Sequence, residues 1–271
     1  MRIAWCTDIH LNFLAPEQYG DFLDKILAAM PDALFITGDI AEAPSLSTYM
    51  ETMDSVLRAP IYFVLGNHDY YHGRISTVRA WAREVTGDGL TGLNWMSAAG
   101  VVSFGETAVV GVDGWGDGRL GNPVSSNVFL NDWLSIRELM HRNPMSQGTH
   151  IYKRIPLLNQ LGDQEAEMLQ EPLKQALETH SKVFVLTHVP PWKEATWHAG
   201  KHSSPDWLPW FSCQAVGDTI LNLAGQYPKT EVTVLCGHTH GQGTSQIADN
   251  VVSITGGARY GHPAISQLFD V

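Results

Sequence analysis

Short runs of apolar residues alternate with amphipathic stretches through the first third of the chain. A continuous apolar run of four or five residues is typical of a strand buried on both faces, and apolar residues at helical spacing predict a helix. Strand, helix, strand in this alternation requires a parallel sheet with right-handed crossovers. The expected strands are 2–6, 33–37 and 61–64, and the expected helices are 16–30, 45–57 and 73–85.

The pattern changes after residue 93, where short strands follow one another with Gly105-Glu106 at a tight hairpin turn. Residues 113–152 look irregular apart from one expected helix at about 132–141, and a further helix is expected from Asp163, with Pro172 bending or restarting it. A second long loop, 189–211, carries four tryptophans. The remaining expected elements are strands 93–96, 100–104, 107–112, 182–186 and 232–236, a helix at 215–227, and three short strands in 243–271.

Polar residues follow five of the expected strands at the point where each strand ends. Open α/β sheets place their chemistry at the carboxyl ends of their strands. Two aspartates, one asparagine and four histidines form a mixed nitrogen and oxygen set, which suits Zn, Fe or Mn. A lone Asp after a strand is more often a helix N-cap, and a lone His is more often a packed histidine, but seven together favour a metal site. They are Asp8, His10, Asp39, Asn67, His188, His238 and His240.

Taken in order, these loops read Asp-x-His, Gly-Asp, Gly-Asn-His-Asp, His and Gly-His-x-His between Asp8 and His240. The set resembles the motifs of the calcineurin-like metallophosphoesterase superfamily over nearly the whole chain. The resemblance implies an α/β fold, a four-layer α/β/β/α sandwich with two central mixed β-sheets. It also implies hydrolysis of a phosphomonoester or phosphodiester by in-line attack of a hydroxide that bridges two metal ions.

The resemblance also assigns roles to the residues. Asp8, His10 and His240 would hold one metal, Asn67, His188 and His238 the other, and Asp39 would bridge them. The cofactors would be two divalent or trivalent ions of Mn, Fe or Zn. His68 would donate a proton to the leaving oxygen or stabilise the transition-state charge, whereas a packing role for His68 is the open alternative.

One departure from the superfamily motifs narrows the choice of enzyme class. Protein Ser/Thr phosphatases carry Gly-Asp-x-x-Asp-Arg-Gly, where residues 38–44 here read Gly-Asp-Ile-Ala-Glu-Ala-Pro. The phosphate-gripping Arg is missing, and Glu42 stands where an Asp would orient the catalytic histidine. This favours bacterial-type phosphomonoesterases or phosphodiesterases, between which the sequence does not choose. A catalytically silent fold used as a protein-binding scaffold is the alternative, and the presence of all eight site residues favours the enzyme.

Substrate contacts are less well marked. Arg119, in a glycine-rich loop, is able to grip phosphate in a bidentate manner or to pair with a nearby carboxylate. The tryptophans at 192, 197, 207 and 210 would stack on a ring or cover the sheet edge. His198 and His202 have helical spacing without a helical pattern, so a third metal site is not expected.

Composition limits the partners. The 271 residues carry a net charge of −11 and no basic patch, which argues against broad nucleic-acid or membrane binding and leaves a small phosphorylated substrate. Three scattered cysteines fit a reducing cytoplasm, and a strand beginning at Arg2 leaves no room for a signal peptide. We expect one cytoplasmic domain, 1–271, with substrate-covering insertions at about 113–160 and 189–212. The oligomeric state stays open.

Overall fold

Two β-sheets form the centre of the molecule in a computed structural model. The structure describes residues 1–87, 89–140 and 147–271, and only the backbone is described at 147–153. The first sheet has the order β13-β1-β2-β3-β4. Its strands β1 to β4 run parallel and β13 is antiparallel to β1. The strands are β1 (Arg2–Cys6), β2 (Ala33–Thr37), β3 (Ile61–Val64), β4 (Leu93–Trp95) and β13 (Gln267–Asp270).

The second sheet has the order β11-β12-β10-β7-β6-β5. Its four inner strands are parallel and both edge strands are antiparallel. The predicted hairpin is confirmed, because β5 and β6 are joined at Gly105, whose φ of 63° suits a glycine in a tight turn. The strands are β5 (Val102–Phe104), β6 (Thr107–Gly111), β7 (Lys182–Leu186), β10 (Glu231–Cys236), β11 (Gly243–Ala248) and β12 (Val251–Thr255).

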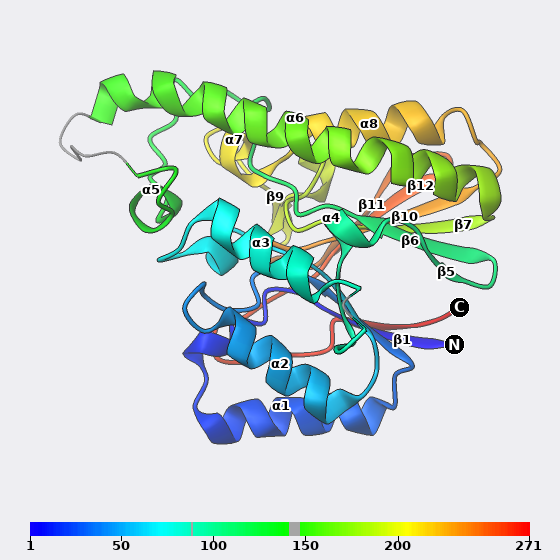
Figure 1. Ribbon diagram of the computed structural model, residues 1–271. Helices are drawn as coiled ribbons and strands as arrows, with labels where there is room; N and C mark the ends of the chain where they lie inside the picture. The colour runs from blue at the N-terminus through cyan, green and yellow to red at the C-terminus, as the bar shows by residue number, and fades with distance from the viewer. Residues whose placement is uncertain (88, 141–146) are drawn as a thin grey trace.

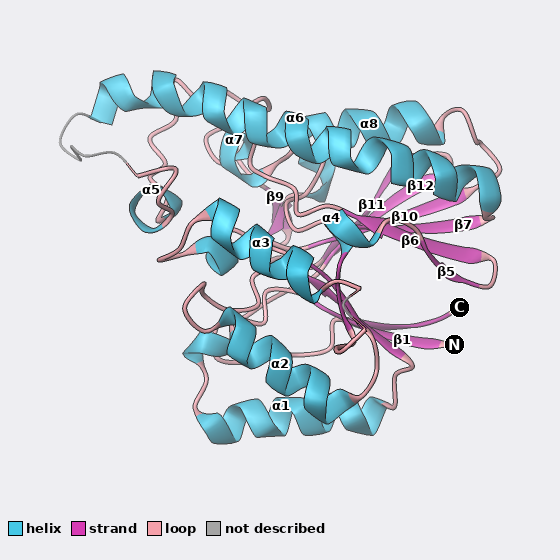
Figure 2. Ribbon diagram, viewed as in Figure 1, coloured by secondary structure: helices cyan, strands magenta, loops and turns pink. Residues whose placement is uncertain are grey.

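Helices cover the outer face of each sheet, so that the layers run helix, sheet, sheet, helix (Figures 1 and 2). Side chains of β1 show why: Ala4 and Cys6 pack toward the helices, whereas Ile3 and Trp5 pack into the core between the sheets. A strand buried on both faces needs this continuous apolar run. The predicted four-layer sandwich is therefore confirmed. The first sheet carries α1 (Pro16–Ala29), α2 (Leu46–Leu57) and α3 (Ile75–Val85), and the second α6 (Gln147–Thr179) and α8 (Gln214–Ala224).

The irregular stretches contain more structure than expected. Helix α6 begins at Gln147 rather than Asp163, and it continues through Pro156 and Pro172 without restarting. A proline inside a helix removes one hydrogen bond, but Leu169 and Leu173 pack into the core under the second sheet and hold the helix there. Residues 141–146 of the first expected insertion lie outside the described residues.

Shorter elements complete the chain, several of them in the second expected loop. They are η1 (Leu11–Phe13), η2 (His68–Tyr70), α4 (Met96–Ala99), α5 (Asp132–Ser135), η3 (Lys193–Ala195), β8 (Trp197–His198), β9 (Lys201–His202) and α7 (Leu208–Phe211). Over the described ranges, no helix combines the length and apolar character needed to cross a bilayer. The division into one domain with two insertions stays a prediction.

Candidate metal centre

All seven predicted ligands lie in loops that follow the carboxyl ends of β1, β2, β3, β7 and β10. The two sheets present these ends on the same side of the molecule. The seven residues are therefore brought together, although they come from positions 8 to 240 of the chain.

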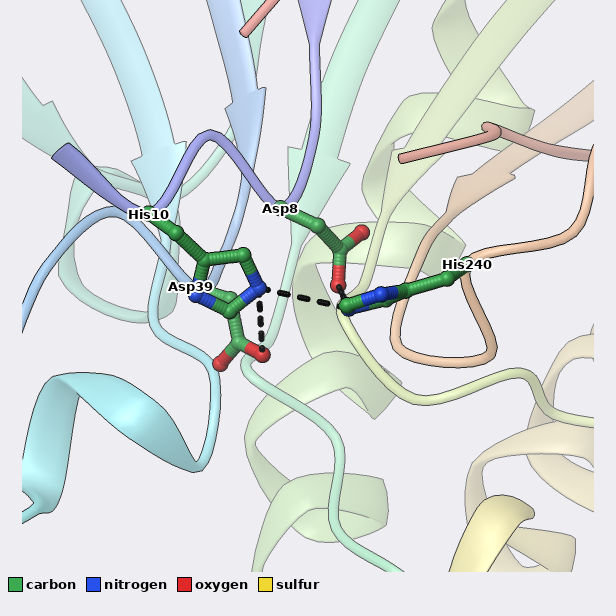
Figure 3. Close-up of side chains that lie close together, drawn as sticks. All are labelled: Asp8, His10, Asp39 and His240. Atoms are coloured by element: carbon green, nitrogen blue, oxygen red, sulfur yellow. Dashed lines mark hydrogen bonds and ion pairs between the residues drawn. The ribbon is translucent and has the colours of Figure 1, made fainter. Parts of the chain in front are cut away.

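A first group contains Asp8, His10, Asp39 and His240, with one ligand atom from each within 4.8 Å of the others (Figure 3). The Nε2 atoms of His10 and His240 are 3.2 Å apart, and Nε2 of His240 is 3.4 Å from Oδ1 of Asp8. Oδ2 of Asp39 is 3.8 Å from Nε2 of His10. Two carboxylates and two imidazoles thus surround one point.

A second group contains Asp39, His188 and His238, again within 4.8 Å. Oδ1 of Asp39 is 3.3 Å from Nε2 of His188. Oδ1 of Asn67 lies 3.3 Å from Nε2 of His188 and 3.1 Å from Nδ1 of His238. Asp39 belongs to both groups and turns one oxygen toward each, which is the geometry that a bridging carboxylate requires.

Hydrogen bonds to backbone carbonyls decide which histidine nitrogens face the second group. His188 donates its Nδ1–H to the carbonyl of Thr37 at 2.8 Å, and His238 donates its Nε2–H to the carbonyl of Trp210 at 3.3 Å. A carbonyl only accepts, so in the neutral rings the other nitrogens carry lone pairs. Those two nitrogens face each other at 3.2 Å, beside oxygens of Asp39 and Asn67. Such a set of convergent donors fits a metal ion.

The electrostatics of the donor set also favour a cation. Burial lowers the pKa of His10 to about 4 and that of His238 to about 3, so both candidate ligands are neutral at pH 7. Burial also opposes the charge on His188, but Asp39 and Asp8 raise the pKa of His188 to about 10. Neighbouring histidines outweigh burial at Asp39 and hold its pKa well below the usual range. The carboxylate of Asp39 therefore stays ionised beside His188, and a bound cation would replace the proton that His188 holds there.

The backbone is strained where it presents these side chains. Nine non-glycine residues of the described chain have positive φ, and five of them are the candidate ligands Asp8, His10, Asp39, His238 and His240. Left-handed conformations of non-glycine residues cost free energy and gather at functional sites. The sequence gives no direct sign of this strain.

Glycines let the loops approach closely. A Cβ added to Gly38 would lie 2.6 Å from Nδ1 of His188, and one added to Gly66 would lie 2.2 Å from Oδ1 of Asp39. A Cβ added to Gly237 would lie 2.1 Å from Oδ2 of Asp8. Each distance is too short for an alanine without displacement of a candidate ligand.

We expect Gly66→Ala to displace Asp39 and to weaken binding of both metals, with a stability cost of about 1–3 kcal/mol from overpacking. Gly20→Ala is the matched control, because a Cβ at Gly20 in α1 meets nothing within 4 Å. That change should stabilise the helix by about 0.5–1 kcal/mol. Metal content and thermal unfolding of both variants check this, and equal metal content in the two would contradict it.

Asp132 was missed by the sequence prediction. Its Oδ1 accepts hydrogen bonds from Nδ2 of Asn67 at 2.8 Å and from the hydroxyl of Tyr71 at 2.6 Å. Nδ2 of Asn67 also lies 3.2 Å from the Tyr71 hydroxyl oxygen. With its amide nitrogen held on this side, Asn67 turns its oxygen toward the histidines. Asp132 begins the short helix α5, and no strand end or motif marks it as a functional residue.

We expect Asp132→Ala to free the Asn67 amide and to lower the affinity for the metal of the second group by about 10- to 100-fold, as removal of such supporting groups usually does. Tyr71→Phe removes one donor to Asp132 and should have a smaller effect. Asp24→Ala, an exposed carboxylate of α1, is the control. Metal titration checks this, and unchanged affinity in Asp132→Ala would refute the positioning role.

Asp69 has a structural role beside the site. Its carboxylate accepts backbone N–H groups from Ile40 and Ala41 at 2.9 Å and from Gly66 at 2.7 Å. It therefore ties the loop after β2, which carries Asp39, to the loop after β3. The carboxylate of the Gly-Asn-His-Asp motif thus fixes the spacing of the two loops.

His68 lies at the edge of the two groups and lines the pocket described below. Its ring stacks on Tyr71 at 4.2 Å between centroids, and its backbone N–H donates to Oδ1 of Asp39 at 2.9 Å. Glu42 stands where the protein phosphatases carry an orienting Asp, and here its Oε2 lies 3.7 Å from Nε2 of His72. The His68 ring also packs edge-on against His10 at 4.7 Å, so Tyr71 and His10 together orient it.

Arg119 does not reach the site. Its guanidinium pairs with Asp117 at 2.9 Å and with Asp163 at 2.7 Å, and it is absent from the described residues that line the pocket. The carboxylate-pairing alternative therefore describes Arg119, and we leave it out of the substrate site. The tryptophans differ in exposure: Trp192 and Trp210 are buried, whereas Trp207 is exposed in the pocket.

The three thiols are buried and free, and the described metal-binding groups do not include them. Burial raises the pKa of Cys6 and of Cys236 to about 12, so neither forms a reactive thiolate at neutral pH. We expect a thiol reagent to modify none of them in the native protein and all three after unfolding without reductant. Loss of turnover on mild thiol blocking of the folded protein would contradict a non-catalytic role.

A pocket of about 760 Å³ opens above the two groups and is lined by Asp39, Asn67, His68, His238 and His240. Both irregular stretches contribute to its wall, through residues 129–132 and through part of 198–211. This volume is in the range of small-molecule sites. The candidate metal centre therefore forms the floor of a cavity with room for a substrate.

Comparison with known proteins agrees with this geometry. Residues 1–242 match the model of a family described as calcineurin-like phosphoesterase. An uncharacterized metallophosphoesterase of Campylobacter jejuni is 31% identical over 80 residues, which span 27% of this chain and 21% of that protein.

Two solved structures share the fold. A dimetal phosphatase from Danio rerio is 13% identical with a TM-score of 0.58, over 95% of this chain and 87% of that chain. A phosphopantetheinyl hydrolase from Mycobacterium tuberculosis is 14% identical with a TM-score of 0.58, over 96% of this chain and 89% of that chain. At these identities the likeness shows the fold alone.

Proposed function

The chain belongs to the calcineurin-like phosphoesterase family, and from that premise we propose that it hydrolyses a phosphate ester at two metal ions bridged by Asp39. The observation that carries the proposal is the shared carboxylate: Asp39 turns Oδ1 toward His188 and Oδ2 toward His10. Two dications a few ångströms apart repel each other, so a negative group between them is needed.

The residues divide into two ligand sets. Asp8, His10 and His240 would hold one ion with Asp39, and Asn67, His188 and His238 would hold the other with the same carboxylate. Mn, Fe and Zn all suit such mixed nitrogen and oxygen donors. When bound, the ions would supply positive charge for the phosphate oxygens and an activated water.

Side chains of the protein would orient the reacting groups and supply a proton to the leaving group. His68 lies beside Asp39 and lines the pocket, so it would face an ester held over the two groups. In the overall reaction, the oxygen of water forms the new bond to phosphorus and the bond from phosphorus to the ester oxygen breaks. His68 would give the departing alkoxide its proton, so that an alcohol leaves. Asp132 and Tyr71 would keep Asn67 oriented during this step.

The competing function is a scaffold without activity. The donor set is complete and backbone carbonyls fix the tautomers of His188 and His238, which supports an enzyme. A choice between monoester and diester is left to the assay, since both fit the pocket volume. A cytoplasmic location and a small phosphorylated substrate remain predictions.

The test is chelation followed by addition of Mn, Fe or Zn one at a time, with monoesters and diesters of the same alcohols as substrates. We expect activity to vanish on chelation and to return with at least one metal. A folded protein that binds these metals and hydrolyses neither class of ester would overturn the proposal in favour of the scaffold.

A further inference from the structure

Exposed aromatic side chains gather at the pocket. Four aromatic residues of the described chain are exposed: Phe13, Phe129, Trp207 and Tyr260. Three of them line the pocket, and the fourth, Phe13, packs against Tyr260 with 5.0 Å between ring centroids. Single exposed apolar residues are normal on a protein surface, but a group of them around one cavity indicates a binding site.

The aromatic rings form two rows that begin at candidate metal ligands. One row runs from His238 to Phe211 at 4.6 Å and on to Trp207 at 4.8 Å. The other runs from His10 to Tyr260 at 4.4 Å. A molecule held at the metal centre therefore meets aromatic surface as soon as it extends into the pocket.

Trp207, at the end of the first row, and Phe129, which packs against Trp133, both leave part of their rings exposed. Trp207 is 40% exposed and Phe129 is 45% exposed, and both line the pocket. Large aromatic surfaces left in water are unfavourable unless something covers them. A flat ring covers them well, because stacking needs only a π-face and tolerates different ring types. Polar groups of the β8–β9 hairpin, including Lys201 and His202, line the same pocket and supply donors beside the rings.

We propose that the substrate is a phosphate ester whose organic group carries an aromatic ring, which binds against Trp207 and Phe129 while the phosphate lies over Asp39. This inference rests on the proposed phosphoesterase function. Two sources share this chemistry, a nucleobase and a simple aryl group, and the substrates below separate them.

The experiment compares esters that differ in the ring and keep a primary alcohol as the leaving group. Benzyl phosphate is paired with ethyl phosphate, and adenosine 5′-monophosphate with ribose 5-phosphate, each also as its methyl diester. The metal-reconstituted full chain is assayed for kcat/KM on both pairs. Binding of benzylphosphonate and ethylphosphonate, which are not hydrolysed, is measured by calorimetry as a readout independent of turnover.

In at least one pair, we expect a higher kcat/KM for the member with an aromatic ring, which is benzyl phosphate or adenosine 5′-monophosphate. Trp207→Ala should lower kcat/KM for that member by roughly tenfold to a hundredfold, the usual size of a lost stacking contact. It should change kcat/KM for the member without an aromatic ring by no more than about twofold, as expected for a surface substitution. Trp207→Phe should keep most of the preference, and Phe129→Ala should lower it independently. Leu27→Ala is the control, because Leu27 in α1 is 41% exposed and lies away from the pocket.

The outcomes separate the two claims. Equal kcat/KM within both pairs, or a ring preference that Trp207→Ala and Phe129→Ala leave unchanged, would overturn this inference while the phosphoesterase function stands. A change of oligomeric state in Trp207→Ala with unchanged ring preference would make the aromatic group an interface and would overturn it as well. A reconstituted protein that is inactive on every ester would overturn the proposed function and this inference with it.

Discussion

Asp39→Ala is expected to lose both metal ions and to lower turnover by more than about 10³-fold. Removal of a single group that stabilises transition-state charge typically costs 10² to 10³, and Asp39 serves both groups, because its two oxygens face His188 and His10. The change also removes the acceptor of the His68 backbone N–H. Metal content by elemental analysis and kcat on the best ester of the panel measure the effect.

Two comparisons make the result specific to a bridge. His240→Ala removes a ligand of the first group only, so this variant should retain the ion of the second group and lose less activity than Asp39→Ala. Asp39→Asn keeps the shape and one acceptor oxygen, and it should fold normally yet bind metal weakly. An Asp39→Ala protein with two ions per chain and normal turnover would refute the bridge.

His68→Ala is expected to keep both metals and to lose roughly 10² to 10⁴ in turnover on alkyl phosphates, the usual size of general acid catalysis. An alkoxide needs a proton in the transition state, whereas a nitrophenolate leaves without one. The loss on an activated aryl phosphate should therefore be clearly smaller. Comparison of benzyl phosphate with nitrobenzyl and nitrophenyl phosphates, all carrying a ring, keeps the aromatic contact constant.

The pattern of losses distinguishes the alternatives for His68. Equal losses on all three esters would assign His68 to phosphate positioning or charge stabilisation. Loss of metal would mean that His68 supports the ligands, since its backbone N–H donates to Asp39 and its ring packs against His10 at 4.7 Å. Tyr71→Phe keeps the ring on which His68 stacks, so that variant should retain the difference between alkyl and aryl esters.

The strands and the residues at their ends were predictable because they depend on local pattern. Apolar runs buried on both faces marked five parallel strands, and the seven residues after them lie together, as parallel strands of a sandwich require. The start of α6 was not predictable in the same way. Pro156 and Pro172 indicate breaks, and only packing of the helix on the second sheet explains why it continues.

Long-range contacts decided what the sequence left open. Asp132 orients Asn67 across 65 positions of chain, and no local pattern marks such a partner. Arg119 had two possible partners in sequence, and the nearness of Asp117 and Asp163 settles its position. One side of the aromatic group was visible as a tryptophan-rich stretch, but Trp207 and Phe129 come to line the same pocket only in the folded chain. Residues that follow a strand are therefore predictable, and residues that complete a site from elsewhere need the fold.

The most direct test of the central claim is anomalous X-ray scattering from crystals of the protein reconstituted with Mn, Fe or Zn, recorded at the absorption edge of each metal. The account predicts two peaks per chain on either side of the Asp39 carboxylate, one among Asp8, His10 and His240 and the other among Asn67, His188 and His238. A single peak, or two peaks that do not share Asp39, would contradict it.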